Sequence, residues 1–102
     1  MAWSFYRSGS ADAVAELSVF VAADLENAAR VMAELTEISN GVRQVPEEDR
    51  NATGQRGLLC RRTDRWAIFY VVPSRNRVKL LHVAELSTPS EELIAEAVRR
   101  KG

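Results

Sequence analysis

The spacing of apolar residues changes partway along this chain of 102 residues, and that change constrains the fold more than any other feature. Between residues 14 and 38, apolar side chains recur at the period of a helix with one buried face. Between residues 57 and 83 they stand in short runs rich in aromatic and β-branched residues, which favour strands. Helices followed by strands predict an α+β fold, and the length suits a single domain over residues 1–102.

The first part of the chain is expected to hold one strand and two helices. Residues 3–7 are rich in aromatic residues and predict a short strand. Ser10 is a suitable N-cap for the first helix and Asp24 for the second, while Asn40 followed by Gly41 is a strong helix stop. Because almost nothing separates the two helices, we expect an antiparallel helical hairpin.

The second part is expected to be a three-stranded antiparallel meander followed by a helix. Residues 42–55 are polar and predict a loop, with Glu47, Glu48 and Asp49 exposed to solvent. The strands are predicted at 57–62, 65–72 and 77–83, with a turn at 73–76. The last helix is predicted to begin with Thr88 as its N-cap and Glu91 in a capping box. The expected order is β-α-α-β-β-β-α.

The formal net charge is zero, but the charge is unevenly distributed. Residues 1–55 carry a net charge of −5 and residues 80–102 a net charge of −1, whereas residues 56–79 carry +6. We call residues 56–79 the basic segment; its cations are Arg56, Arg61, Arg62, Arg65, Arg75, Arg77 and Lys79. We expect these side chains to gather on one exposed surface of the sheet, which could bind phosphates or an acidic protein.

Several classes of protein are disfavoured by the composition. No apolar stretch is long enough to span a membrane, and the first residues do not resemble a secretory signal. Cys60 is the only cysteine, so it can form neither an internal disulfide nor a cysteine-based zinc site. The sequence therefore predicts a cytoplasmic protein without a metal or other cofactor.

Four segments of the second half resemble, in order and spacing, the HigB-like branch of the RelE/ParE superfamily of toxins. They are Gly-Leu-Leu-Cys-Arg-Arg at 57–62, Trp-Ala-Ile-Phe-Tyr at 66–70, Val-Lys-Leu-Leu-His at 78–82, and the segment 88–100 that begins Thr-Pro-Ser-Glu-Glu. The resemblance implies a RelE/ParE-like fold, with a twisted antiparallel sheet packed against helices. It also implies the toxin of a bacterial type II toxin–antitoxin module, neutralised by a cognate antitoxin.

Many members of that superfamily cleave mRNA on the ribosome without a metal, by attack of the RNA's own 2′-hydroxyl on the adjacent phosphate. If this chain does the same, the candidate catalytic residues are Arg62, Arg65, Tyr70 and His82. The arginines would bind phosphate through paired donors, and the histidine and tyrosine could transfer protons. The candidate RNA-binding residues are Arg56, Arg61, Arg75, Arg77 and Lys79.

Plainer interpretations stand beside each of these. His82 could be a hydrogen-bonded histidine at a strand end, sharing a face with Val78 and Leu80, and Tyr70 could be a core residue. The arginines could be a solvated strand edge, and Cys60 a small core residue.

The sequence also departs from the superfamily pattern. Ala67 stands where an arginine is usual, and Ala84-Glu85-Leu86 replaces a common lysine pair. These departures favour the alternative of a non-catalytic binding protein of the same fold, either an inhibitor of DNA gyrase or an antitoxin-binding module. An unrelated α+β adaptor is a third alternative.

Overall fold

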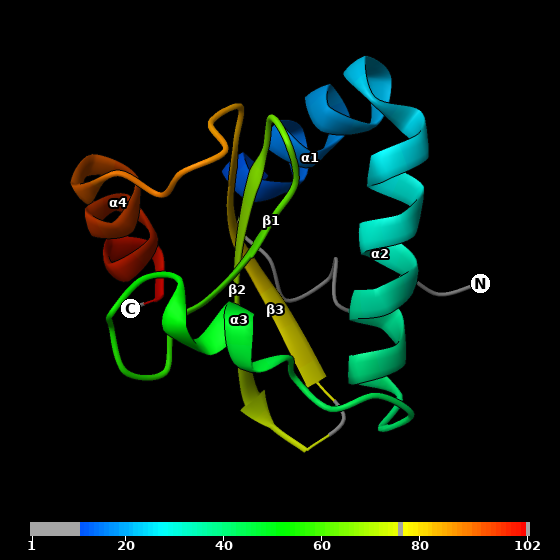
Figure 1. Ribbon diagram of the computed structural model, residues 1–102, viewed down its shortest axis with the longest axis vertical. Coiled ribbons are helices and arrows are strands. Elements are labelled where there is room, and N and C mark those ends of the chain that lie inside the picture. The colour runs from blue at the N-terminus through cyan, green and yellow to red at the C-terminus, as the bar shows by residue number, and fades with distance from the viewer. Residues whose placement is uncertain (1–10, 76, 102) are drawn as a thin grey trace.

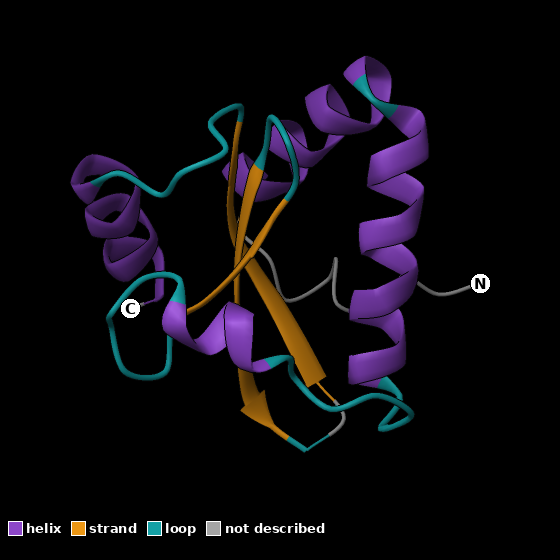
Figure 2. Ribbon diagram, viewed as in Figure 1, coloured by secondary structure: helices purple, strands orange, loops and turns teal. Residues whose placement is uncertain are grey.

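In the computed structural model, which describes residues 11–75 and 77–101, a three-stranded antiparallel sheet lies between helices (Figures 1 and 2). Three helices come first: α1 (Ala11–Ala23), α2 (Leu25–Ser39) and the short α3 (Glu47–Asn51). The strands β1 (Leu59–Arg62), β2 (Ala67–Ser74) and β3 (Arg77–Ala84) precede the last helix, α4 (Glu91–Lys101). The α+β class is confirmed. The predicted strand at 3–7 and the predicted cap at Ser10 lie outside the described residues.

The boundary between α1 and α2 is a single residue, Asp24 (Figure 1). Its main-chain amide donates to the Phe20 carbonyl and so continues α1, while its carboxylate accepts from the Asn27 amide at 3.3 Å and caps α2. At the other end, α2 stops before Asn40 and Gly41, whose φ of 76° suits a residue without a side chain. Both predicted signals are confirmed.

The described strands have the order β1-β2-β3, so β1 and β3 are the outer strands of this part of the sheet. The register between β2 and β3 shifts after Phe69, which pairs with His82, while Tyr70 pairs with Leu80. Leu81 is the extra residue of this bulge. Because the bulge reverses the alternation, Val83 and not His82 joins Val78 and Leu80 in one core cluster. The prediction that His82 shares their face is wrong.

Each face of the sheet packs into a separate core. The first core lies against α1 and α2 and includes Leu17, Leu35, Trp66 and Tyr70. The second lies against α4 and is built from Leu58, Cys60, Ala67, Phe69, Val71, Leu81 and Ala97. Figure 1 shows α2 and α4 on opposite sides of the sheet. The prediction that Cys60 is a core residue is confirmed, and burial raises the pKa of its thiol to about 12.

Two local predictions are wrong. The polar stretch 42–55 contains the helix α3 after Pro46, and Asp49 within it is only 3% exposed. The last helix begins at Glu91, and the Leu93 amide donates to Ser90 Oγ at 3.2 Å. Ser90, not Thr88, therefore caps α4. Within residues 11–75 and 77–101, no helix has the length and apolarity to cross a membrane.

Candidate functional site

The two candidate catalytic arginines flank the turn between β1 and β2. Arg62 is the last residue of β1 and is exposed, with no ion-pair partner among the described residues. Arg65 is also exposed and forms an ion pair with Glu85, which follows β3. This end of the sheet therefore offers one uncommitted guanidinium group, at Arg62, and one that is neutralised at the surface.

Tyr70 lies inside the first core and is bound to a buried carboxylate. Its side chain is fully buried, and its hydroxyl donates to Asp49 Oδ2. Burial first, and then this hydrogen bond, raise the pKa of Tyr70. The same carboxylate accepts from Arg61 Nε at 3.1 and 3.2 Å, and Arg61 also forms an ion pair with Glu34 on α2. The cluster Glu34–Arg61–Asp49–Tyr70 thus ties α2 and α3 to β1 and β2.

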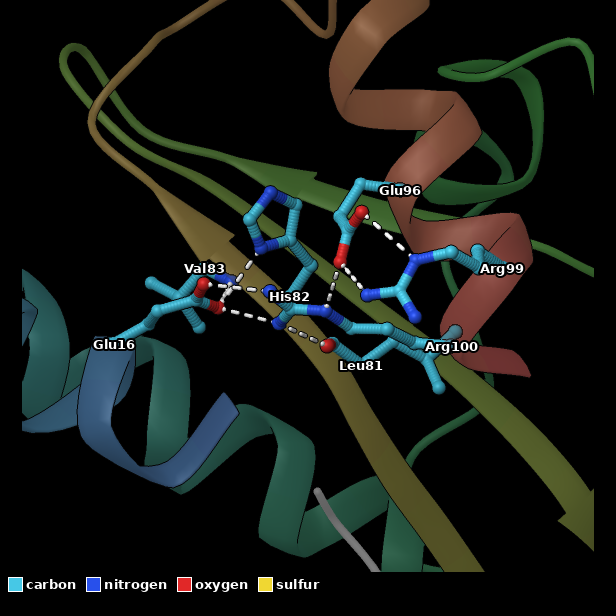
Figure 3. Close-up of polar contacts among 7 residues, drawn as sticks. All are labelled: Glu16, Leu81, His82, Val83, Glu96, Arg99 and Arg100. Carbon is cyan, nitrogen blue, oxygen red and sulfur yellow. Dashed lines mark hydrogen bonds and ion pairs between the residues drawn. The ribbon is translucent and has the colours of Figure 1, made fainter. Parts of the chain in front are cut away.

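His82 belongs to a second polar cluster, at the opposite edge of the sheet (Figure 3). Its Nδ1 lies 2.8 Å from Glu16 Oε1, and its ring stacks on Phe69 at a centroid distance of 5.8 Å. The Glu16 carboxylate also accepts from both terminal nitrogens of Arg100 on α4, at 2.9 and 3.0 Å. Burial alone would raise the pKa of Glu16, but the hydrogen bonds from Arg100, the Val83 amide and His82 outweigh it and lower that pKa.

The Arg100 guanidinium is also held from its own helix. It bonds Glu96 at 2.7 Å, and Arg99 contacts the same carboxylate (Figure 3). Hydrogen bonds from Arg99 and then Arg100 lower the pKa of Glu96 to about 2. Glu16, Glu96 and Arg100 are not among the site residues predicted from the sequence. Arg100 and Glu16 are 84 positions apart, so no local pattern could have paired them.

The structure does not bring the four candidate catalytic residues together. Tyr70 packs in the first core, whereas His82 stacks on a residue of the second, so the two candidate proton donors occupy opposite faces of the sheet. Both side chains are buried and bonded to carboxylates within the protein. A general acid and a general base must reach the same phosphate, and this arrangement gives them no common site.

The cations of the basic segment do not share one surface either. Arg75 and Arg77 lie at the turn between β2 and β3, and Lys79 follows on β3. Arg62 and Arg65 lie at the other end of β2, whose eight residues extend over about 23 Å. Arg56 precedes β1, and Arg61 forms ion pairs with Glu34 and Asp49. The expectation of a single basic surface is therefore not met.

A polar cleft of about 880 Å³ lies instead along β1. One wall comes from α2 and another from α3 and the residues before it, including Arg30, Glu34, Pro46 and Glu48. The strand contributes Cys60, Arg61 and Arg62, and the turn after it contributes Thr63 and Asp64. Its charged lining is balanced, with four arginines and four carboxylates, which are Arg30, Arg43, Arg61, Arg62, Glu34, Glu48, Asp49 and Asp64.

Neither a metal site nor a known relative helps to assign a function to this chain. Among the described residues, no group of three histidine, cysteine, aspartate or glutamate side chains could hold a metal ion. No protein-family model matches the chain, and neither does any curated protein or solved structure.

Proposed function

We propose that this chain is a toxin-like protein of RelE/ParE type that acts by binding a protein and does not cleave RNA. The segments at 57–62, 66–70, 78–82 and 88–100 that resemble the superfamily supply the toxin assignment. From its first helix onward, the superfamily's order α-α-β-β-β-α is compatible with the described order α-α-α-β-β-β-α, which has one more short helix, α3. A cytoplasmic location, a cognate antitoxin and a target such as DNA gyrase belong to the same proposal.

One observation carries the choice of binding over cleavage: Tyr70 and His82 are buried on opposite faces of the sheet. A metal-independent ribonuclease needs an acid, a base and a cation around one phosphate. Here the tyrosine hydroxyl is bound to Asp49, the imidazole to Glu16, and the uncommitted Arg62 lies at the hairpin end. Cleavage would require Tyr70 to leave the first core and His82 to leave its contacts with Glu16 and Phe69, which is a large cost for a small domain.

The test is inducible expression of the whole chain in growing bacteria, with growth, total mRNA integrity and plasmid supercoiling followed together. We expect growth arrest with intact mRNA, and no codon-phased cuts when RNA 5′ ends are mapped. Loss of negative supercoiling would identify gyrase as the target. Codon-phased cuts that disappear in Arg62→Ala would overturn the binding mechanism, and continued growth at high expression would overturn the toxin assignment.

A further inference from the structure

Among the described strands, β1 has a neighbour on one side only, so its outer edge is unpaired. The Thr63 amide donates to the Trp66 carbonyl at 2.8 Å, and Arg61 is opposite Ile68 in the next pair of the same kind. Since hydrogen-bonded and non-hydrogen-bonded pairs alternate in an antiparallel ladder, the main-chain groups of Cys60 and Arg62 point away from β2. No other hydrogen bond from residues 11–75 or 77–101 reaches these groups.

On the other outer strand, β3, some outward main-chain groups do have side-chain partners. On β3, the outward Val83 amide donates to Glu16 Oε1 at 2.9 Å, and the Leu81 carbonyl accepts from Arg100 Nη1 at 3.0 Å. Side chains from α1 and α4 thus cap this part of β3 against pairing with another strand. Figure 3 shows the Glu16 and Arg100 side chains side by side next to β3. The outward main-chain groups of Cys60 and Arg62 on β1 have no such partner within 11–75 and 77–101.

The free edge of β1 faces the cleft of about 880 Å³. Successive side chains of a strand point to opposite faces, so a cavity that is lined by Cys60, Arg61 and Arg62 must run along the strand's edge. Figure 1 shows β1 on the viewer's side of the sheet, with α2 and α3 around it. The cleft therefore gives an incoming chain access to unpaired main-chain donors and acceptors.

The charges of the cleft favour a peptide as the occupant. Arg30 and Arg62 have no carboxylate partner among the described residues, and Glu48 and Asp64 have no cationic one. A nucleic-acid backbone would bring phosphates toward both of these carboxylates, which costs free energy. A peptide can present an acidic side chain to Arg62 while it avoids or complements the carboxylates.

We infer that the edge of β1 is the docking site for an extended segment of a partner protein, which adds to the sheet as a new strand beside β1. Main-chain hydrogen bonds to Cys60 and Arg62 provide the register, and an acidic side chain near Arg62 provides selectivity. This inference rests on the proposed function, because it names the surface through which the chain binds its partner.

The test uses a phage-displayed library of random dodecapeptides and the purified full chain. Arg62→Pro removes one outward amide without disturbing the ladder to β2, since proline is tolerated where an edge N–H faces solvent. Arg62→Ala removes the same side chain but keeps the amide. For selected peptides, we expect Arg62→Pro to weaken binding by about tenfold or more and Arg62→Ala by about threefold.

Arg50→Ala is the matched control, because Arg50 is exposed on α3 and does not line the cleft. Its affinities should equal those of the unmodified chain. Hydrogen exchange of the unmodified chain provides a second measurement that needs no variant: bound peptide should protect the Cys60 and Arg62 amides. A library without binders, equal affinities for the proline and alanine variants, or protection elsewhere would overturn the inference. The proposed function is judged separately, by growth and mRNA integrity in cells.

Discussion

At the scale of single residues, Asp49 makes buried contacts that its sequence context does not indicate. It is the third of three consecutive acids in a polar stretch, which predicts a solvated loop. Its partners Arg61 and Tyr70 are 12 and 21 positions away, so only the folded chain brings them together. The predicted core role of Tyr70 followed from strand alternation, but the acceptor for its hydroxyl could not be found in that way.

Replacing Asp49 by alanine is expected to destabilise the protein by about 3 kcal/mol, because it leaves the partly buried Arg61 and the buried Tyr70 hydroxyl without their shared acceptor. Tyr70→Phe removes one hydrogen bond and should cost about 1 kcal/mol. Urea unfolding of both variants measures the difference. Equal costs would show that Asp49 does not hold the cluster together.

Glu16 predicts a pH dependence of stability. Its pKa in the folded state is lowered from the ordinary value of 4.5, so its contribution is complete above 4.5 and disappears as the pH falls through the folded-state pKa. At neutral pH, Glu16→Gln should lower the free energy of unfolding by about 1–2 kcal/mol. The difference should shrink below pH 4.5.

Urea titrations at several pH values, in a His82→Gln background, isolate the Glu16 effect from titration of the imidazole itself. If the cost of Glu16→Gln in that background stayed constant down to strongly acidic pH, the assignment of this pH dependence to the Glu16 carboxylate would be contradicted.

At the scale of elements, sequence signals that act within a few residues predict the structure well. Asp24 and the Asn40-Gly41 stop bound α2 as predicted, because capping and left-handed turns are local. The bulge after Phe69 was missed because it is a property of two strands together, and it moved His82 to another face. At the start of α4, two suitable hydroxyl residues compete, and the structure selects Ser90 over Thr88.

Ser90→Ala should therefore cost about 1 kcal/mol, because it removes the acceptor for the Leu93 amide at the first turn of α4. Thr88→Ala is the matched control, since Thr88 is exposed and precedes the cap, and it should change the free energy of unfolding by less than about 0.5 kcal/mol. Chemical denaturation of the two variants gives the comparison. A larger cost for Thr88→Ala would restore Thr88 as the cap.

At the scale of the whole molecule, the positive charge of the basic segment follows directly from its composition. Where its charged side chains lie in the fold does not follow from the sequence. A meander sends alternate turns to opposite ends of the sheet, so Arg65 and Arg75 separate although they are close in sequence. The free edge of β1 was equally hidden, because edge status depends on the strand order. The same sheet serves both cores, since neighbouring residues of β2 such as Phe69 and Tyr70 face opposite sides.

Because one set of strands carries both cores, the molecule should unfold as a single cooperative unit. Leu81→Ala, a change in the second core, should lower the free energy of unfolding by about 2–5 kcal/mol. In a Trp3→Phe background, fluorescence reports on Trp66 in the first core, while far-ultraviolet circular dichroism reports on the helices, α4 included. Both signals should shift to the same lower urea midpoint. A Trp66 transition that stays in place while the dichroism moves would mean that the two faces of the sheet unfold separately, and α4 could then detach without disturbing the strands to which a partner would bind.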